Sequence, residues 1–233
     1  MRLRTAAAVA IGGYLIGSIS FARLVGRKVA AGEDLSQTTL DLPGDSTMTY
    51  SAVSATSIGV RAGPLWGITT SALDIAKAYV PTLLARRRWP GESYHLVVAT
   101  ATLVGHNYPL YHRFKGGRGQ TVIYGSVLAI DWVAVPVTSA AGMLIGFGAL
   151  REIFVAYTLG MGLLIPWFAA RRKGPETVYV AVANALFAVA TIPEAKEYFA
   201  VRKAGGVRQV SSLREVLTSH PAVRAEDHDS TGG

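Results

Sequence analysis

Long apolar stretches separated by short charged connectors dominate the pattern of this chain. Most of them approach the length that a helix needs to cross the hydrocarbon core of a bilayer. The polar residue Asp131 and the helix breaker Pro136 divide the apolar block over 119–150 into two. We therefore predict an all-α fold, a polytopic integral membrane bundle of about seven transmembrane helices, near 5–25, 65–85, 94–110, 119–132, 133–150, 153–170 and 176–192.

The two ends of the chain differ from this pattern. The N-terminus has two arginines followed by an apolar run from Thr5 to Val25, which is long enough to span a bilayer and is interpreted as a retained first helix. Residues 207–233 are polar, and we expect them to be partly disordered. The sequence therefore predicts a membrane-embedded domain over 1–206 and a polar tail over 207–233.

Composition supports the membrane assignment and narrows the partners. Half of the 233 residues are hydrophobic and only 16% are charged, whereas a soluble domain is about one quarter charged. The absence of cysteine excludes disulfides and thiolate chemistry. The net charge of +8 suits membrane lipids with anionic headgroups or a phosphorylated substrate. No nucleic-acid module accompanies the charge, so we expect no nucleic acid as partner. The histidines show no metal-like spacing, so we predict no metal site.

The most informative connector is "GHNYPLYHRFKGGRG" at 105–119. Lys115 and Arg118 supply positive charge, and the glycines Gly116, Gly117 and Gly119 let the backbone approach an anion closely. The next apolar segment begins here, and the N-terminus of a helix favours an anion. His106 lies at the membrane edge, where an imidazole can serve as acid, base or hydrogen-bond donor. From these features alone, a phosphate site and an ordinary basic loop that touches lipid headgroups are equally good interpretations.

The spacing of this loop resembles the second motif of the bacterial acyl-phosphate:glycerol-3-phosphate acyltransferases, approximately GHxFPxFxxFKGGKG, without gaps. "YLIGSISF" at 14–21 is similar to the first-helix "YLLGSIPF" of that family, and "LDIAKA" at 73–78 is similar to its "LDILKG". The resemblance covers most of 14–205. It implies a small integral enzyme of the plasma membrane with several spans, whose active-site loops we expect in the cytoplasm.

The activity that the resemblance implies is acyl transfer without a cofactor. A fatty acyl-phosphate gives its acyl group to the 1-hydroxyl of glycerol 3-phosphate, which yields lysophosphatidic acid in the first step of phospholipid synthesis. Neither a metal nor coenzyme A is required. His106 would orient or deprotonate the hydroxyl, while Lys115, Arg118 and the glycine N–H groups would hold phosphate.

Other family motifs align with changed residues in this chain. A phosphate-binding stretch like "GSGNPGATN" aligns with "TYSAVSATS" at 49–57, and the resemblance assigns substrate contacts there to Thr56, Ser57 and the nearby Arg61. A Ser-x-x-Ser pair falls at 155–158 and a C-terminal "HREN" at 195–198, where Thr158 and Glu197 are the polar residues that remain. Two alternatives therefore stay open: a related acyltransferase with a different acceptor, and a non-catalytic membrane protein that binds lipid or a partner.

Three polar residues inside apolar segments have structural interpretations. Asp74 and Lys77 are one helical turn apart, and we expect a neutralising ion pair that fixes helix packing. Asn184 in the last segment is expected to form a hydrogen bond between helices.

Overall fold

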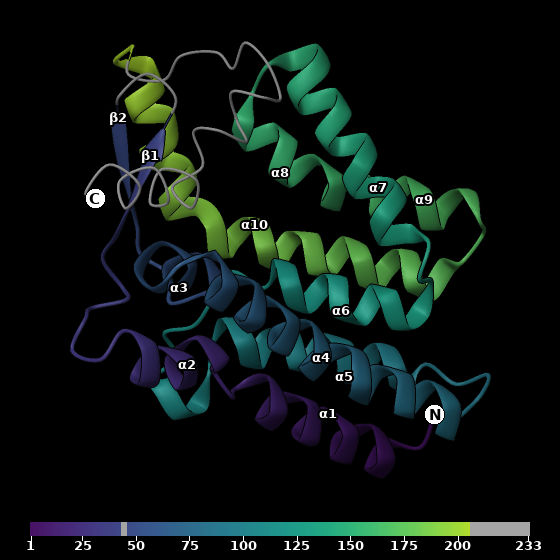
Figure 1. Cartoon of the computed structure of the whole chain (residues 1–233). Helices are drawn as coiled ribbons and strands as arrows, with labels where there is room; N and C mark the ends of the chain where they lie inside the picture. The colour runs from purple at the N-terminus through teal and green to yellow at the C-terminus, as the bar shows by residue number, and fades with distance from the viewer. Residues whose placement is uncertain (43–45, 206–233) are drawn as a thin grey trace.

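The computed structural model describes residues 1–42 and 46–205. The predicted tail over 207–233 lies outside this part, so its boundary stays a prediction. Helices make up most of the described chain (Figure 1), and their bounds are α1 Leu3–Gly17, α2 Phe21–Val29, α3 Ala55–Ala62, α4 Pro64–Arg88, α5 Tyr94–Asn107, α6 Gln120–Ile130, α7 Ala134–Met143, α8 Ile153–Gly162, α9 Leu164–Ala170 and α10 Gly174–Lys203. A short 3₁₀ helix, Leu110–His112, follows α5, and a π-helical segment, Leu144–Leu150, continues α7.

The helices form a bundle in which neighbours in space are often distant in sequence. Helix α1 packs against α5, and α4 packs against both α5 and α6 (Figure 1). The helices α7 and α8 pack against each other, and α10 crosses beside α6. Because α1, α4 and α5 lie together, their polar residues meet at one end of the bundle.

Three described helical stretches are long and apolar enough to cross a membrane: Leu3–Val29, Ile153–Ala170 and Gly174–Lys203. The shorter apolar stretches Gln120–Ile130 and Ala134–Leu150 accompany them. The protein is therefore a helical membrane protein, as the apolar pattern predicts, while the number of seven spans stays a prediction. The predicted division of 119–150 is confirmed, because α6 ends at Ile130 and the Asp131 carboxylate accepts hydrogen bonds from Val133 N, Trp167 Nε1 and Arg171.

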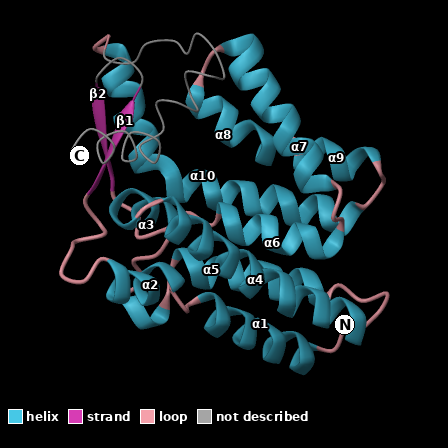
Figure 2. Cartoon of the chain, viewed as in Figure 1, coloured by secondary structure: helices cyan, strands magenta, loops and turns pink. Residues whose placement is uncertain are grey.

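A two-stranded antiparallel hairpin is the feature that an all-α prediction omits. Strand β1 (Thr38–Leu42) pairs with β2 (Ser46–Tyr50), with Thr38 opposite Tyr50. Both strands are rich in threonine, a β-branched residue that favours extended backbone. Figure 2 shows the hairpin beside the C-terminal part of α10, with which β2 makes contact. The hairpin belongs to the connector over 27–63, so it leaves the helical class of the bundle unchanged.

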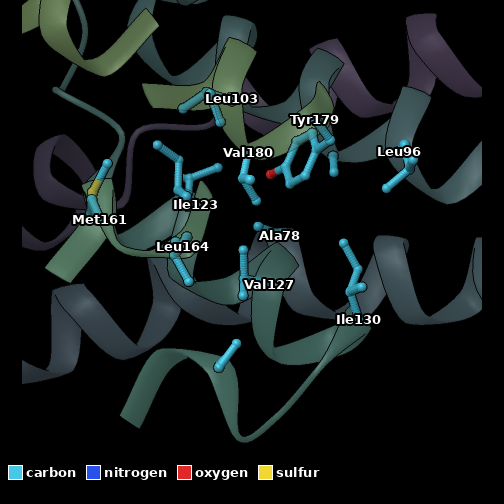
Figure 3. Close-up of a cluster of buried hydrophobic side chains, with 14 of the residues drawn as sticks. Ala78, Leu96, Leu103, Ile123, Val127, Ile130, Met161, Leu164, Tyr179 and Val180 are labelled. Atoms are coloured by element: carbon cyan, nitrogen blue, oxygen red, sulfur yellow. The ribbon is translucent and has the colours of Figure 1, made fainter. Parts of the chain in front are cut away.

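The main core lies between α4, α5, α6, α8, α9 and α10. Figure 3 shows side chains from these helices converging, among them Leu103, Ile123, Met161 and Val180, all fully buried. The predicted role of Asn184 is confirmed, because its Nδ2 donates to Met161 O at 3.1 Å and so joins α10 to α8. Burial of this apolar cluster fixes α5 and α6, the two helices that carry the ends of the glycine-rich loop.

Candidate active site

The glycine-rich loop leaves α5 at Asn107 and enters α6 at Gln120. Tight turns shape it, since His112 N and Phe114 N both donate to Pro109 O. Arg113 and Phe114 have left-handed backbone, with φ of 52° and 60°, which is costly for side chains other than glycine. Helix α1 holds the loop from one side, because Tyr14 Oη donates to Tyr108 O at 3.0 Å. The loop therefore has a defined shape.

The glycines of the loop lie directly on the last turn of α5. Gly117 N donates to His106 O at 3.1 Å. A Cβ atom on Gly117 would lie 2.3 Å from His106 Nε2, and one on Gly116 would lie 2.1 Å from His106 O. No side chain fits at either position. Gly119 has φ of 91° and caps the N-terminus of α6, so the sequence KGGRG is needed for this close approach.

A buried polar network lies beneath the loop. Lys77 Nζ is 2.8 Å from Asp74 Oδ1, which confirms the ion pair predicted for these residues. The same ammonium donates to Ile19 O at 2.8 Å and lies 2.9 Å from His106 Nδ1. All three side chains are buried. The network therefore links α4, α5 and the segment after α1.

The partners of Lys77 determine the role of the His106 ring. An ammonium group has three donors and accepts nothing, and here it has three acceptors within 2.9 Å. His106 Nδ1 therefore accepts, and the ring proton of the neutral imidazole is on Nε2, beside Gly117. The ring lies against Gly117 of the loop, and its polar contacts within the described chain are with Lys77 and Asp74 through Nδ1. His106 is not among the residues that line the cavity above.

An open cavity of about 780 Å³ lies above the loop. Its walls come from α2, the segment over 30–37, Ser51, the loop and the middle of α10. Of the predicted site residues, Lys115, Gly116, Gly117 and Arg118 line this cavity together. The structure thus brings the charged and glycine parts of the loop to one concave surface.

Lys115 and Arg118 differ in how they are held. Lys115 is exposed at the cavity and, among residues 1–42 and 46–205, its ammonium has no ion-pair partner. Arg118 contacts the Glu194 carboxylate of α10, and its Nη2 donates to Ser51 Oγ at 2.9 Å. Ser51 Oγ in turn lies 2.9 Å from Glu194 Oε1. Residue 51 of the predicted phosphate stretch therefore does lie beside the loop.

The other residues predicted near 49–61 lie away from the cavity. Ser57 Oγ is buried and donates to Ala52 O at 2.6 Å, and Thr56 N donates to the N-cap Ser54 of α3 at 3.2 Å. Arg61 pairs with Glu33 at 3.0 Å and donates to Gln37 O at 2.7 Å. Because Glu33 and Gln37 line the cavity, Arg61 holds one of its walls from behind.

Thr158 and Glu197 also have local partners. Thr158 Oγ1 donates to Phe154 O within α8 at 2.8 Å, and Glu197 Oε1 accepts from Thr49 N of β2 at 2.7 Å. Neither side chain lines the cavity. Glu197 fastens the hairpin to α10, which is a structural contact.

The electrostatics of the cavity favour an anion. Four basic side chains line it, Arg23, Arg27, Lys115 and Arg118, against two acidic ones, Glu33 and Asp34. Hydrogen bonds from the Ser36 hydroxyl and backbone lower the pKa of Asp34, which keeps it ionised. Burial, followed by the charges of Arg23 and Arg27, lowers the pKa of His112, so this histidine is neutral at neutral pH. The net positive surface suits a phosphoryl group.

A comparison of the whole sequence with known protein families agrees with the charges and glycines of the loop. The family model "Glycerol-3-phosphate acyltransferase" matches residues 7–198. The chain belongs to the glycerol-3-phosphate acyltransferase family. The match includes the loop, the buried network and α10 as far as Tyr198.

Named relatives agree with this membership. The glycerol-3-phosphate acyltransferase of Anaeromyxobacter dehalogenans strain 2CP-C is 35% identical over 157 residues, covering 65% of this chain and 71% of the relative. The glycerol-3-phosphate acyltransferase of Pseudomonas paraeruginosa strain PA7 is 32% identical over 177 residues, covering 75% of this chain and 87% of the relative. This acyltransferase-family chain thus shares most of its length with these relatives.

The fold is also that of a solved member of the glycerol-3-phosphate acyltransferases. Two crystal structures of PlsY, an integral membrane glycerol 3-phosphate acyltransferase, resemble the chain with TM-scores of 0.70 for the glycerol 3-phosphate form and 0.72 for the lysophosphatidic acid form. Their sequences are 22% and 21% identical, and each match covers 91% of this chain and 98% of the other. The likeness confirms the predicted helical membrane fold.

Three residues that line the cavity or contact the loop were not predicted as site residues. Arg23 donates to Lys115 O at 3.1 Å from α2, Glu194 pairs with Arg118, and Asn107 lies at the end of α5. Glu194 falls beyond the last predicted span, 176–192, and its partner Arg118 is 76 positions away, so local spacing did not indicate this pair. Arg23 gave no signal either, since Lys115 is 92 positions away, and Asn107 occupies a position that the family motif leaves open.

Proposed function

We propose that this protein transfers a fatty acyl group from acyl-phosphate to the 1-hydroxyl of glycerol 3-phosphate, forming lysophosphatidic acid. The observation that carries the proposal is the cavity where Lys115, Arg118 and two glycines of a family-matching loop meet, with no ion-pair partner for Lys115 among the described residues. An acyl-phosphate is already activated, so the protein's task is to position a hydroxyl against a carbonyl carbon and to stabilise negative charge.

Each residue of the loop has a different proposed role in binding phosphate. Lys115 supplies a point charge whose ammonium is free to meet a phosphoryl oxygen. Gly116 and Gly117 let that oxygen approach the backbone, since neither carries a side chain. Arg118, held by Glu194 and Ser51, adds a fixed positive charge on the α10 side of the cavity.

The reaction itself consists of one acyl transfer and one proton transfer, with phosphate as the leaving group. The hydroxyl oxygen of the acceptor forms an ester bond to the acyl carbon, and the bond from that carbon to the bridging phosphate oxygen breaks. The hydroxyl proton leaves with the phosphate. His106, whose Nδ1 contacts Lys77 and whose ring lies against Gly117, would hold the loop in place instead of removing the proton. Thr56, Ser57, Thr158 and Glu197 would contribute through the local structure that they hold, and Arg61 through the cavity wall.

The setting of the reaction follows from the chemistry of the two substrates. We propose a multi-pass protein of the plasma membrane whose loop faces the cytoplasm, since glycerol 3-phosphate is charged and stays in water. The acyl chain of the other substrate is apolar and would remain among the helices. The large apolar surface of the helical bundle supports this arrangement.

Purified protein in liposomes tests the proposal directly. Wild-type protein given fatty acyl-phosphate and glycerol 3-phosphate is expected to release inorganic phosphate and form lysophosphatidic acid in equal amounts. Lys115→Ala is expected to slow this about 100-fold, the effect of removing one positioned charge-stabilising donor. Lys28→Ala is the matched control, because Lys28 is an exposed lysine of α2 that does not line the cavity. No acceptor-dependent phosphate release by the wild type, or equal rates for all three proteins, would contradict the proposal.

A further inference from the structure

Two basic triplets meet at the end of the bundle opposite the glycine-rich loop. The first, at 86–88, ends α4, and the second, at 171–173, connects α9 to α10. Arg86 Nη1 donates to the last carbonyls of α6, at 2.8 and 2.9 Å, and Arg171 Nη1 lies 2.8 Å from the carboxylate of Asp131, the residue after α6. Both triplets therefore lie around the end of α6 that is far from the loop, on the side of the N-terminus in Figure 1.

The turn at 171–173 has a defined shape. Arg172 N donates to Ala169 O at 3.0 Å, and Lys173 N donates to Phe168 O at 3.1 Å. The Arg171 guanidinium also stacks on Trp167, 3.9 Å from the ring centre. Together with Arg86 at the end of α6, these contacts fix the position of each triplet on the protein.

The other arginines of the triplets have no such contacts. Arg87, Arg88 and Arg172 are exposed, and none of them has an ion-pair partner within residues 1–42 and 46–205. Arg172 also has left-handed backbone, with φ of 54°, which is costly for a residue other than glycine or asparagine. Packing of the described chain gives no reason for three free guanidinium groups here.

The acidic side chains at this end do not neutralise them. Asp131 is bound to Arg171, and Glu92 pairs with the N-terminal ammonium at 2.8 Å. Glu176 lies in the first turn of α10. Because basic groups outnumber these carboxylates, the surface has a net positive charge that suits an anion.

The surface of α4 below its arginines is apolar and exposed. Val80 and Leu84 are 49% and 60% exposed. Leu84 is three and four residues before Arg87 and Arg88, and Val80 is four residues before Leu84, so all four share one face of the helix. In a membrane bundle, such a face contacts acyl chains. The arginines then lie where the acyl chains end and the headgroups begin.

Tryptophans support this placement. Trp89 follows α4, Trp132 lies between α6 and α7, and Trp167 belongs to α9 beside Asp131. Trp132 is 75% exposed. Tryptophan is enriched at the boundary between the hydrocarbon core and water, which is the level of lipid headgroups.

We propose that this end of the protein binds the headgroups of anionic phospholipids, with Arg87, Arg88 and Arg172 as the groups that contact phosphate. A guanidinium can donate two parallel hydrogen bonds to a phosphate. Phosphatidylglycerol offers such a phosphate with a net negative charge, and its acyl chains would cover Val80 and Leu84. Phosphatidylcholine has the same phosphate, but its cationic choline cancels the charge. The role is separate from acyl transfer, which is proposed for the opposite end of the bundle.

Native mass spectrometry of the protein in detergent, with added lipid, tests this binding. Each basic residue near an anionic lipid surface is worth about fivefold in affinity. The wild type is therefore expected to bind phosphatidylglycerol at least about tenfold more tightly than phosphatidylcholine. A triple variant, Arg87→Gln with Arg88→Gln and Arg172→Asn, is expected to reduce this ratio to within about twofold.

A second triple variant is the matched control for net charge. Lys28→Gln, Lys196→Gln and Lys203→Gln remove three exposed lysines of α2 and α10 away from this end, and we expect the preference for phosphatidylglycerol to stay within about twofold of the wild type. Equal binding of the two lipids by the wild type would overturn the inference. So would an arginine variant that keeps the preference, or a lysine variant that loses it to the same extent, since the attraction would then depend on net charge alone.

The single variant Arg172→Asn separates lipid binding from a structural role. Asparagine tolerates the left-handed backbone, so the melting temperature in detergent alone is expected to stay the same or rise. The rise in melting temperature that phosphatidylglycerol causes is expected to be smaller than in the wild type. A variant that melts earlier without lipid, and gains as much from the lipid as the wild type, would show that Arg172 is structural.

Inorganic phosphate distinguishes a lipid from a soluble anion as the ligand. Sodium phosphate is expected to displace phosphatidylglycerol no better than sodium chloride of equal ionic strength, because it lacks acyl chains for the apolar face of α4. Preferential displacement by phosphate would overturn the assignment to lipid. None of these measurements requires turnover, so a protein without acyltransferase activity could still support the inference, and an active one could still contradict it.

Discussion

The polar groups below the glycine-rich loop and those above it differ in how completely they are paired. Below, Lys77 uses its three donors on Asp74, Ile19 O and His106, at 2.8–2.9 Å. Above, Lys115 lies exposed at the cavity and has no ion-pair partner among the described residues.

This contrast indicates different roles for the two sets of polar groups: the lower layer, formed by Asp74, Lys77 and His106, and the upper layer, formed by Lys115 and Arg118 with its partner Glu194. A network of paired charges inside a membrane bundle rigidifies its neighbours, and it is expensive to disturb. A partly unpaired one holds its hydrogen-bonding capacity for a ligand. The loop lies between the two, and its glycines let it rest on His106 while presenting charge to the cavity.

The largest effect is expected from breaking the lower layer. Lys77→Met leaves the Asp74 carboxylate buried without its partner, and we expect the free energy of unfolding to fall by about 3–5 kcal/mol. Thermal or denaturant unfolding in detergent measures this. The double variant Asp74→Asn with Lys77→Met removes both charges and is expected to recover part of the loss. A single variant as stable as the wild type would show that the lower layer does not carry the structure.

A smaller effect is expected where the loop contacts the lower layer. Gly117→Ala places a methyl group 2.3 Å from His106 Nε2, and the ring or the loop must shift. Overpacking of this kind costs about 1–3 kcal/mol, and phosphate release should fall with it. Gly12→Ala is the matched control, because a Cβ atom at Gly12 of α1 meets nothing within 4 Å. Equal unfolding curves for the two variants would contradict the described contact between loop and histidine.

The ion pair of the upper layer is expected to matter less for stability and more for the ligand. Glu194→Gln weakens the hold on Arg118 and is expected to cost about 1–2 kcal/mol, the worth of a hydrogen bond to a charged group. The freed guanidinium should bind inorganic phosphate several-fold more tightly. Glu152→Gln is the control, since Glu152 pairs with Arg202 and does not line the cavity. Unchanged phosphate affinity in Glu194→Gln would show that Arg118 has a structural role and does not bind phosphate.

The smallest effect is expected at the exposed wall. Arg61→Ala removes a partly exposed ion pair with Glu33, and such pairs contribute about 0.2–1 kcal/mol. The variant also removes two hydrogen bonds from Arg61 to the backbone of the wall over 33–37. We therefore expect a clear rise in the Michaelis constant for the acceptor together with only a small loss of stability. A Michaelis constant equal to that of the wild type would show that Arg61 has no part in shaping the cavity.

The helical bundle and the loop were predictable because their signals are local. Apolar runs indicate the helices, and the spacing from Gly105 to Gly119 indicates both an anion-binding loop and the family. The ion pair of Asp74 and Lys77 was predictable because the two residues are one helical turn apart. Each of these depends on residues that are close in sequence, where periodicity and spacing carry the information.

The rest of the site depends on contacts between distant segments. Arg61 aligns near a family arginine, yet it pairs with Glu33 and supports a wall. Glu194 meets Arg118 across 76 positions of the chain. The strands Thr38–Leu42 and Ser46–Tyr50 lie in a connector without strong hydrophobic alternation. Chain spacing does not fix such pairings, since they follow from how α2, α3 and α10 pack.

A structure of the protein with glycerol 3-phosphate bound measures the central claim most directly. We expect the phosphate against Lys115, Gly116 and Gly117, with Arg118 on the α10 side. A phosphate bound elsewhere, with Lys115 turned to solvent and the cavity above the loop empty, would contradict the account.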